Sequence, residues 1–195
     1  MVTKTRDRLI EVARQLFAHK GIENTTMNDI ASASEKGRRT IYTYFKNKRE
    51  IYNAVVERES ENLVKRLREI AALEIAPAEK LEHYLKARFE LIINSFQKRD
   101  TILSLFGRDY RRMERMRKMA LEKEHAILND ILTKGIKSGD FDPVQARRLV
   151  SVERMTFQGV DFSYIRDNFS DMDSSPAEIR DNIIAFIMQA VVTKH

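Results

Sequence analysis

The stretch that decides the fold is residues 26–48, which read TMNDIASASEKGRRTIYTYFKNK. Thr26 and Asp29 have the spacing of a capping box, which predicts that a helix starts directly after Thr26. The polar residues 34–37 interrupt the helical pattern, and a short basic helix is predicted over residues 38–44. Its inward-facing side chains are expected to be Ile41, Tyr42 and Phe45. Two short helices joined by a tight turn, the second of them basic, predict a helix-turn-helix.

Helical periodicity continues through nearly the whole chain, and no sustained period-2 alternation of the kind found in strands occurs. The cap-and-proline pairs Asp142-Pro143 and Ser175-Pro176 each predict a helix start. The predicted fold is therefore all-α. About nine helices are expected: 4–20, one beginning at Thr26, 38–44, 48–72, one after Pro77 that reaches Phe96, 101–106, 108–138, 143–168 and 176–193.

The positive charge is concentrated at the start of the chain. Residues 1–50 carry 11 Lys and Arg against 6 Asp and Glu, while residues 51–195 carry 24 against 23. A polyanionic partner is expected for the first quarter, because binding it releases condensed counterions. The alternative is a basic end that only keeps the protein soluble, and charge alone does not decide between the two.

Several other classes of protein do not fit the composition. The 195 residues include no cysteine, which excludes disulfides, thiolate metal sites and a cysteine nucleophile. The four histidines have no metal-ligand spacing, so no metal site is expected; they are His19, His83, His125 and His195. No apolar run approaches the roughly 20 residues that span a bilayer, and the N-terminus lacks an apolar signal-peptide core. A soluble, cytoplasmic protein without cofactor or enzymatic activity is expected.

The residue types around the second short helix suit DNA. Arg38 and Arg39 lie at the N-terminal end of that helix, which normally meets base edges, and arginine suits a bidentate contact with guanine. Gly37 lets the backbone approach the DNA closely. The expected DNA-binding residues are Thr26, Gly37, Arg38, Arg39, Thr40, Tyr42, Tyr44, Lys46 and Lys48. Thr40 is expected to contact a base. The residues expected to contact phosphates are Thr26, Tyr42, Tyr44, Lys46 and Lys48.

Some of these residues have a second interpretation. Thr26 caps a helix whether or not it contacts a phosphate. Tyr42 can belong mainly to the core, and Lys46 and Lys48 can belong to a solvated face. A purely structural role is harder to assign to Arg38 and Arg39, because two adjacent arginines on a short helix cannot both pack inward.

The segment from Arg8 to about Val56 resembles the DNA-binding domain of the TetR family of bacterial repressors. The matching residues are Ala13, Leu16, Phe17, Gly21, Thr25, Thr26, Ile30, Ala31, Thr40, Ile41, Tyr42, Tyr44, Phe45 and Lys48. The resemblance implies a DNA-binding domain over residues 1–48, a connecting helix over about 48–72, and a ligand-binding and dimerisation domain over 49–195. The turn differs from the family pattern, because Glu35 and Lys36 stand where the family usually has Gly-Val. A residue with a side chain must then adopt the glycine's backbone angle, or the turn must differ.

The resemblance also implies an effector cavity and a dimer in the second part of the chain. Candidate cavity residues are Phe89, Ile93, Phe96, Leu103, Phe106, Tyr110, Met113, Met116, His125, Phe157, Asp161 and Tyr164. For each of them ordinary core packing is the alternative, and His125 is more often a structural histidine than a ligand contact. The candidate dimer interface is Ile179, Ile183, Ile184, Phe186, Ile187, Ala190 and Val191, a stripe broader than a small domain usually buries by itself. The alternative is an internal core helix, and the interface is favoured because one reading helix per subunit needs a dimer to read a palindrome.

The sequence thus predicts a homodimeric repressor that a small-molecule inducer releases from a palindromic operator in double-stranded DNA. The alternatives are a non-specific architectural DNA-binding protein and a regulator that responds to no ligand. An enzyme is not expected, because the chain shows no phosphate-binding loop, metal motif or paired acid and base.

Overall fold

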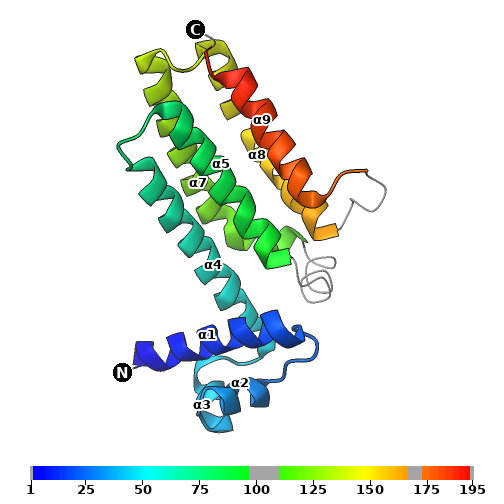
Figure 1. Cartoon of the computed structure of the whole chain (residues 1–195). Helices are drawn as coiled ribbons and strands as arrows, with labels where there is room; N and C mark the ends of the chain where they lie inside the picture. The colour runs from blue at the N-terminus through cyan, green and yellow to red at the C-terminus, as the bar shows by residue number, and fades with distance from the viewer. Residues whose placement is uncertain (1, 97–109, 167–172, 194–195) are drawn as a thin grey trace. The chain divides into compact units, whose positions relative to one another are not determined.

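The structure is a computed structural model (Figure 1). It describes the backbone of residues 2–96, 110–166 and 173–193, and the side chains of residues 4–90, 118–161, 163 and 173–193. Its eight helices are α1 Val2–Lys20, α2 Met27–Ala33, α3 Arg38–Tyr44, α4 Lys48–Ala71, α5 Pro77–Phe96, α7 Tyr110–Ser138, α8 Pro143–Arg166 and α9 Pro176–Val191. The all-α prediction is confirmed, while the helix predicted over residues 101–106 lies outside the described residues.

The helix starts follow the caps predicted from the sequence. The Thr26 hydroxyl accepts a hydrogen bond from the Asp29 N–H at 3.1 Å, and the Asp29 carboxylate accepts one from the Thr26 N–H at 2.9 Å. Ser175 and Glu178 form the same capping box at the start of α9. Each box satisfies two backbone donors that a helix otherwise leaves without partners.

The chain divides into two compact units, residues 1–61 with 95–117 and residues 62–94 with 118–195. The core of the first unit is built by α1, α2, α3 and the first turns of α4. Its buried residues are Leu9, Ile10, Val12, Ala13, Phe17, Ile22, Met27, Ile30, Ala31, Ile41, Phe45, Ile51, Ala54 and Val55. Ile51, Ala54 and Val55 pack into this core, so the first turns of the connecting helix α4 belong to the first unit.

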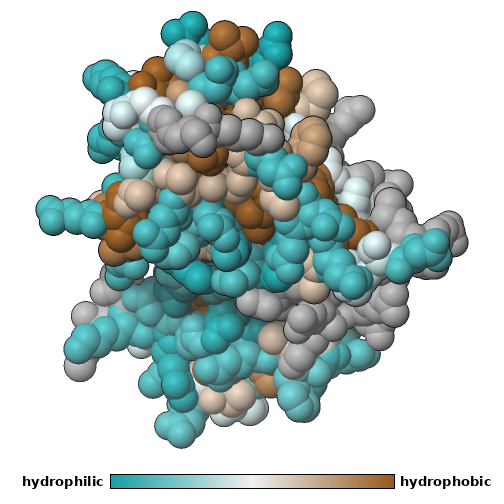
Figure 2. Space-filling model, turned by 45° about the horizontal axis from the view of Figure 1, so that its top comes forward, coloured by the Kyte–Doolittle hydropathy of each residue, from teal (hydrophilic) through white to brown (hydrophobic). Residues whose placement is uncertain are grey.

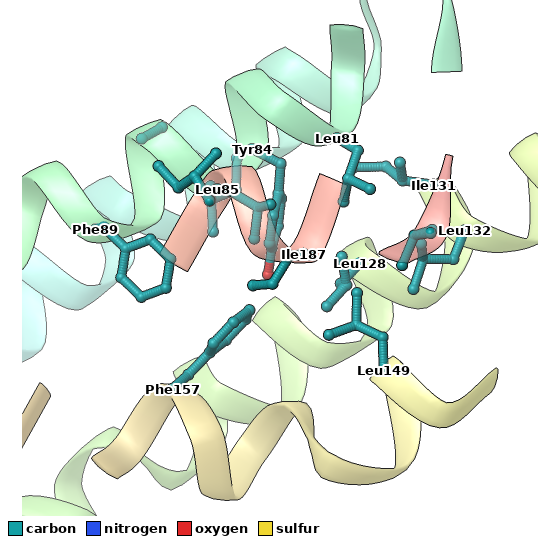
Figure 3. Packing of buried hydrophobic residues seen from close by; sticks show 14 of the residues in the cluster. Leu81, Tyr84, Leu85, Phe89, Leu128, Ile131, Leu132, Leu149, Phe157 and Ile187 are labelled. Carbon is teal, nitrogen blue, oxygen red and sulfur yellow. The ribbon is translucent and has the colours of Figure 1, made fainter. Parts of the chain in front are cut away.

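The core of the second unit lies among the second half of α4, which contributes Leu63 and Leu67, and α5, α7, α8 and α9. Figure 3 shows Leu85 and Phe89 of α5, Leu128 of α7, Phe157 of α8 and Ile187 of α9 pointing toward one another. All five side chains are buried. Burying side chains of this size stabilises a fold by about 1.5–3 kcal/mol each, so this layer is a main source of the unit's stability.

The turn between α7 and α8 depends on a close approach between Gly135 and Phe141. A Cβ atom added to Gly135 would lie 2.1 Å from the Phe141 ring, so only glycine fits there. The buried Phe141 pairs with Val192 in an antiparallel bridge, and the Asp142 N–H donates to the Val191 oxygen at 2.9 Å. The turn thereby holds the C-terminal end of α9.

Across the part of the chain that the structure describes, no helix combines the length and the apolar character that crossing a membrane requires.

Candidate nucleic-acid interface

Helix α3 has one buried and one exposed side. Ile41 and Phe45, four residues apart, are almost completely buried. Arg38 and Arg39 are both exposed, as two adjacent arginines had to be. Tyr42 is 43% exposed, so the prediction that it faces inward was wrong. It lies four residues after Arg38, on the same side of the helix, and the Arg38 guanidinium carbon is 5.7 Å from the centre of its ring.

The remaining members of the expected site flank this exposed face. Thr26, Gly37 and Lys46 are exposed, while Thr40 and Tyr44 are half-buried. Among the residues whose side chains are described, Arg38, Arg39 and Lys46 form no ion pair with an acidic side chain. Their positive charge is therefore available to an anionic partner.

The turn that leads into α3 is built by a non-glycine residue with a positive φ. Glu35 has φ 58°, the left-handed conformation that glycine adopts most easily. The Glu35 N–H donates to the Ser32 oxygen at 3.0 Å, and the Lys36 N–H donates to the Ala31 oxygen at 2.9 Å. The sequence-based inference that a residue with a side chain adopts the turn angle is confirmed. The exposed Lys36 follows it.

Lys48 has intramolecular partners that the sequence did not indicate. Its ammonium group donates to the Ile22 oxygen at 2.6 Å and lies 3.3 Å from the Glu23 oxygen. It therefore ties the start of α4 to the loop after α1. A lysine ammonium has three donors, so a phosphate contact by the third stays a prediction.

Four of the predicted effector-site residues have described side chains. The Phe89 and Phe157 rings meet edge to face, with their centres 5.4 Å apart, and both are buried. Asp161 is buried beside them, and His125 is half-buried. The His125 Nδ1 atom is 2.7 Å from a carboxylate oxygen of the buried Glu153, as expected for a structural histidine.

The other eight predicted effector-site residues are not described at the side-chain level. Leu103 and Phe106 lie outside the described residues altogether. The backbone of the remaining six belongs to helices, and their side chains lie outside the described set: Ile93, Phe96, Tyr110, Met113, Met116 and Tyr164. Whether these eight residues line a cavity stays a prediction.

A buried arginine joins the described effector-site residues, and the sequence analysis did not single it out. Arg88 of α5 is 0% exposed and donates to both carboxylate oxygens of Asp161 at 2.6 Å. Its Nε is 3.4 Å from the Glu124 carboxylate of α7. Its guanidinium carbon lies 4.9 Å from the Phe157 ring centre and 5.5 Å from that of Phe89.

The electrostatics of Arg88 follow from this surrounding. Burial by itself would lower the pKa of the Arg88 guanidinium, but the charge and hydrogen bonds of Asp161 and the charge of Glu124 hold it above its ordinary value. The buried Tyr84 hydroxyl donates to the Glu124 backbone oxygen at 3.0 Å, and burial raises the pKa of Tyr84. The cluster is therefore a charged layer that joins α5, α7 and α8.

The predicted dimer residues of α9 divide between two faces. Ile184, Ile187 and Val191 are buried in the core of their own unit. Phe186 is 74% exposed, and Met155 of α8 is 81% exposed. The remaining predicted interface residues are Ile179 and Ile183, both half-buried, and Ala190, which is exposed. Figure 2 shows one face of the molecule, on which hydrophobic residues form small groups among hydrophilic ones. Among the described residues, Met155, Phe186 and Met119 (69%) are the most exposed large hydrophobic side chains.

Two short helices with an exposed basic face on the second define the class of the first unit, a helix-turn-helix. Residues 9–55 match the family described as bacterial regulatory proteins, tetR family. Over these residues the chain is similar to the TetR family of bacterial transcriptional regulators.

Individual relatives cover different shares of the chain. The probable acrEF/envCD operon repressor of Escherichia coli K12 is 48% identical over 50 residues, 26% of this chain and 23% of that protein. The transcriptional repressor KstR2 of Mycolicibacterium smegmatis is 29% identical over 143 residues, 71% of this chain and 68% of that protein. The crystal structure of a transcriptional regulator from Cytophaga hutchinsonii has a TM-score of 0.73 and 25% identity, covering 95% and 97% of the two chains. The chain thus spans about a quarter of the length of the E. coli relative it matches.

Proposed function

We propose that the chain is a sequence-specific DNA-binding regulator that acts in the bacterial cytoplasm as a homodimeric repressor. The observation that carries this proposal is the exposed face of α3, where Arg38 and Arg39 have no acidic partner among the described side chains. Their guanidinium groups are free to hydrogen-bond guanine in the major groove. Two such helices in a symmetric dimer read a palindrome whose half-sites lie about 34 Å apart.

The phosphate contacts surround this face. Thr26 accepts a hydrogen bond from Asp29, and its hydroxyl proton is left for a phosphate oxygen. Lys46 and the phenol groups of Tyr42 and Tyr44 can contact the backbone on either side of the bases. Lys48 contributes through its third donor.

The dimer is proposed to form through the outward face of α9 together with α8. Ile179, Ile183, Phe186 and Ala190 follow one another at helical spacing along one stripe of α9. Burying exposed side chains such as Phe186 and Met155 against a second copy removes apolar surface from water. Phe186→Glu is expected to shift the protein toward the monomer in sedimentation, because the new charge would be buried at the interface. The control Leu73→Glu, at an exposed apolar residue of the α4–α5 loop, should leave the dimer intact; an intact Phe186→Glu dimer would refute this interface.

The effector is proposed to be a small molecule bound in the second unit, near the charged layer around Arg88. Phe89, Phe157 and Asp161 are buried there, and we propose that an effector which enters this part of the unit would contact them. An inducer that favours a conformation with the wrong spacing of the recognition helices lowers DNA affinity, and bound DNA must weaken inducer binding by the same factor. A regulator that responds to no ligand would show no such coupling.

The experiment that tests the function is selection of bound fragments from the source genome, followed by competition with bulk DNA. A sequence-specific regulator enriches a short palindrome and holds it against an excess of random DNA. Arg38→Ala and Arg39→Ala should each weaken that complex by about 1–3 kcal/mol and relax preference at one position. Equal affinity for the enriched and random fragments would instead indicate a non-specific architectural protein.

A further inference from the structure

A groove in the second unit lies outside all the residues assigned above. It is formed by the last turns of α4 and the middle of α7, and its volume is 410 Å³. Four small or apolar residues line it: Ala71 at the end of α4 and Ala72 directly after it, with Ala126 and Ile127 of α7. The three alanine side chains are too short to fill the space between the two helices. The volume is in the range of sites for small organic molecules, about 300–1,000 Å³.

The charged residues of the groove are mostly basic. Arg68 of α4 and Lys123 and Lys134 of α7 line it, against one acidic residue, Asp130. Lys134 and Asp130 pair with each other at 2.7 Å. Arg68 and Lys123, by contrast, form no ion pair with any acidic side chain that the structure describes. Two unneutralised cations therefore stand beside an apolar surface.

We propose that this groove binds a small amphipathic organic anion, such as a carboxylate with a short hydrocarbon chain. Arg68 and Lys123 bind the anionic group, since charge-assisted hydrogen bonds to a carboxylate are stronger than neutral ones. The hydrocarbon part lies on the methyl groups of Ala71, Ala72 and Ala126, where it leaves water. The site is separate from the layer around Arg88 and does not depend on the regulatory function proposed above.

The test is a titration of the full-length protein with sodium octanoate, followed by methyl NMR of labelled alanine and isoleucine residues. Saturable shifts are expected for the methyl groups of Ala71, Ala126 and Ile127. The methyl group of Ala146, which is completely buried elsewhere in the second unit, reports that the fold is intact. Octyltrimethylammonium has the same chain with the opposite charge and should produce no saturable shift of these methyl groups. Inorganic phosphate, which lacks the chain, should bind at least about tenfold more weakly.

Two sets of variants test separately how the charge and the shape of the groove contribute to octanoate binding. Arg68→Ala combined with Lys123→Ala should weaken octanoate binding by at least about tenfold. Ala126→Leu should block it without changing any charge, because the larger side chain fills the groove. The control is Lys86→Ala, which removes an exposed lysine of α5 that is paired with Glu82, and it should bind octanoate as the wild type does.

Three results would each overturn the proposal. The first is the absence of saturable octanoate shifts at the groove methyl groups. The second is octanoate affinity that the double variant leaves unchanged. The third is an equal response to octyltrimethylammonium or to phosphate, which would show that the groove does not select an amphipathic anion.

Discussion

Replacement of Arg88 by methionine should be among the most destabilising single changes in the second unit. The guanidinium is 0% exposed, and it donates two hydrogen bonds of 2.6 Å to Asp161 while lying 3.4 Å from Glu124. Methionine fills a similar volume but leaves the two buried carboxylates without this cation. Removing one partner of a buried ion pair costs about 3–5 kcal/mol, a large part of the 5–15 kcal/mol that typically stabilises a protein.

The matched control is the ion pair between Arg66 and Glu90, whose side chains are 56% and 39% exposed and whose closest atoms are 3.1 Å apart. Because solvent screens this pair, Arg66→Met should cost no more than about 1 kcal/mol. Both variants can be measured by urea unfolding monitored by circular dichroism. Arg88→Met combined with Asp161→Asn should be less destabilised than the sum of the two single variants, since each single change already removes the interaction between Arg88 and Asp161.

A stability of Arg88→Met within about 1 kcal/mol of the wild type, as is expected for Arg66→Met, would contradict a large contribution of Arg88. That result would mean that the charged layer is no more important to stability than a surface pair. Strict additivity of the two single changes would contradict the direct coupling between Arg88 and Asp161.

Three further changes test the local structure. Glu35→Gly should stabilise the first unit by about 0.5–1 kcal/mol in thermal unfolding, because relief of a left-handed conformation worth roughly 1–2 kcal/mol exceeds the entropy cost of glycine; a loss of stability would contradict the assigned turn. Thr26→Ala should cost about 1 kcal/mol in thermal unfolding, because it removes the hydroxyl that accepts from the Asp29 N–H; a cost near zero would contradict the cap. In an NMR titration the pKa of Asp29 should lie below its ordinary value, mainly because of the hydrogen bond from the Thr26 backbone N–H and also because of the Thr26 side chain, and Thr26→Ala should raise it only in part because alanine keeps that N–H. Since the pKa is depressed, the contribution of Asp29 is present above its ordinary pKa and is lost as the pH falls through the folded value; an Asp29 pKa that is not lowered in the wild type would refute the capping box. Gly135→Ala should cost about 1–3 kcal/mol in chemical unfolding, because the added Cβ overlaps the Phe141 ring, and an unchanged midpoint would rule out that close approach.

The bounds of the helix-turn-helix were predicted closely because they depend on local signals, namely caps and the spacing of apolar residues. The capping box at Thr26 marks the start of α2, and α3 covers the predicted residues 38–44. The predicted inward orientation of Tyr42 was wrong, although the spacing of the residues in α3 indicates the outward one. Once Ile41 and Phe45 define the buried side, a residue four positions after the exposed Arg38 lies on the outer side.

Contacts between distant residues were not predictable in the same way. Arg88 shares the apolar stripe of Tyr84 and Leu81, which signals a buried arginine, but Asp161 is 73 positions away along the chain. Lys48 likewise bonds the Ile22 oxygen, 26 positions earlier. The periodicity of a single sequence cannot identify such partners, because these contacts depend on how the helices pack in the tertiary structure.

The broad apolar stripe of α9 shows a different limit. Its residues separate into a buried face, with Ile184, Ile187 and Val191, and an outward face that includes Phe186. Both faces are apolar, so the sequence pattern alone could not tell which one serves the core of the unit. The structure shows which residues face the core, and the outward face is the one that we propose for the dimer.

The most direct test of the central proposal is the affinity of the protein for the genomic fragment it enriches, compared with random DNA of the same length at one salt concentration. We expect a preference of at least about 10³-fold for the enriched palindrome, the lower end for sequence-specific proteins. Arg38→Ala and Arg39→Ala should reduce this preference without a comparable loss of affinity for random DNA. Equal affinity of the wild type for both fragments, or a preference that survives both substitutions, would contradict the assignment of α3 as the reading helix.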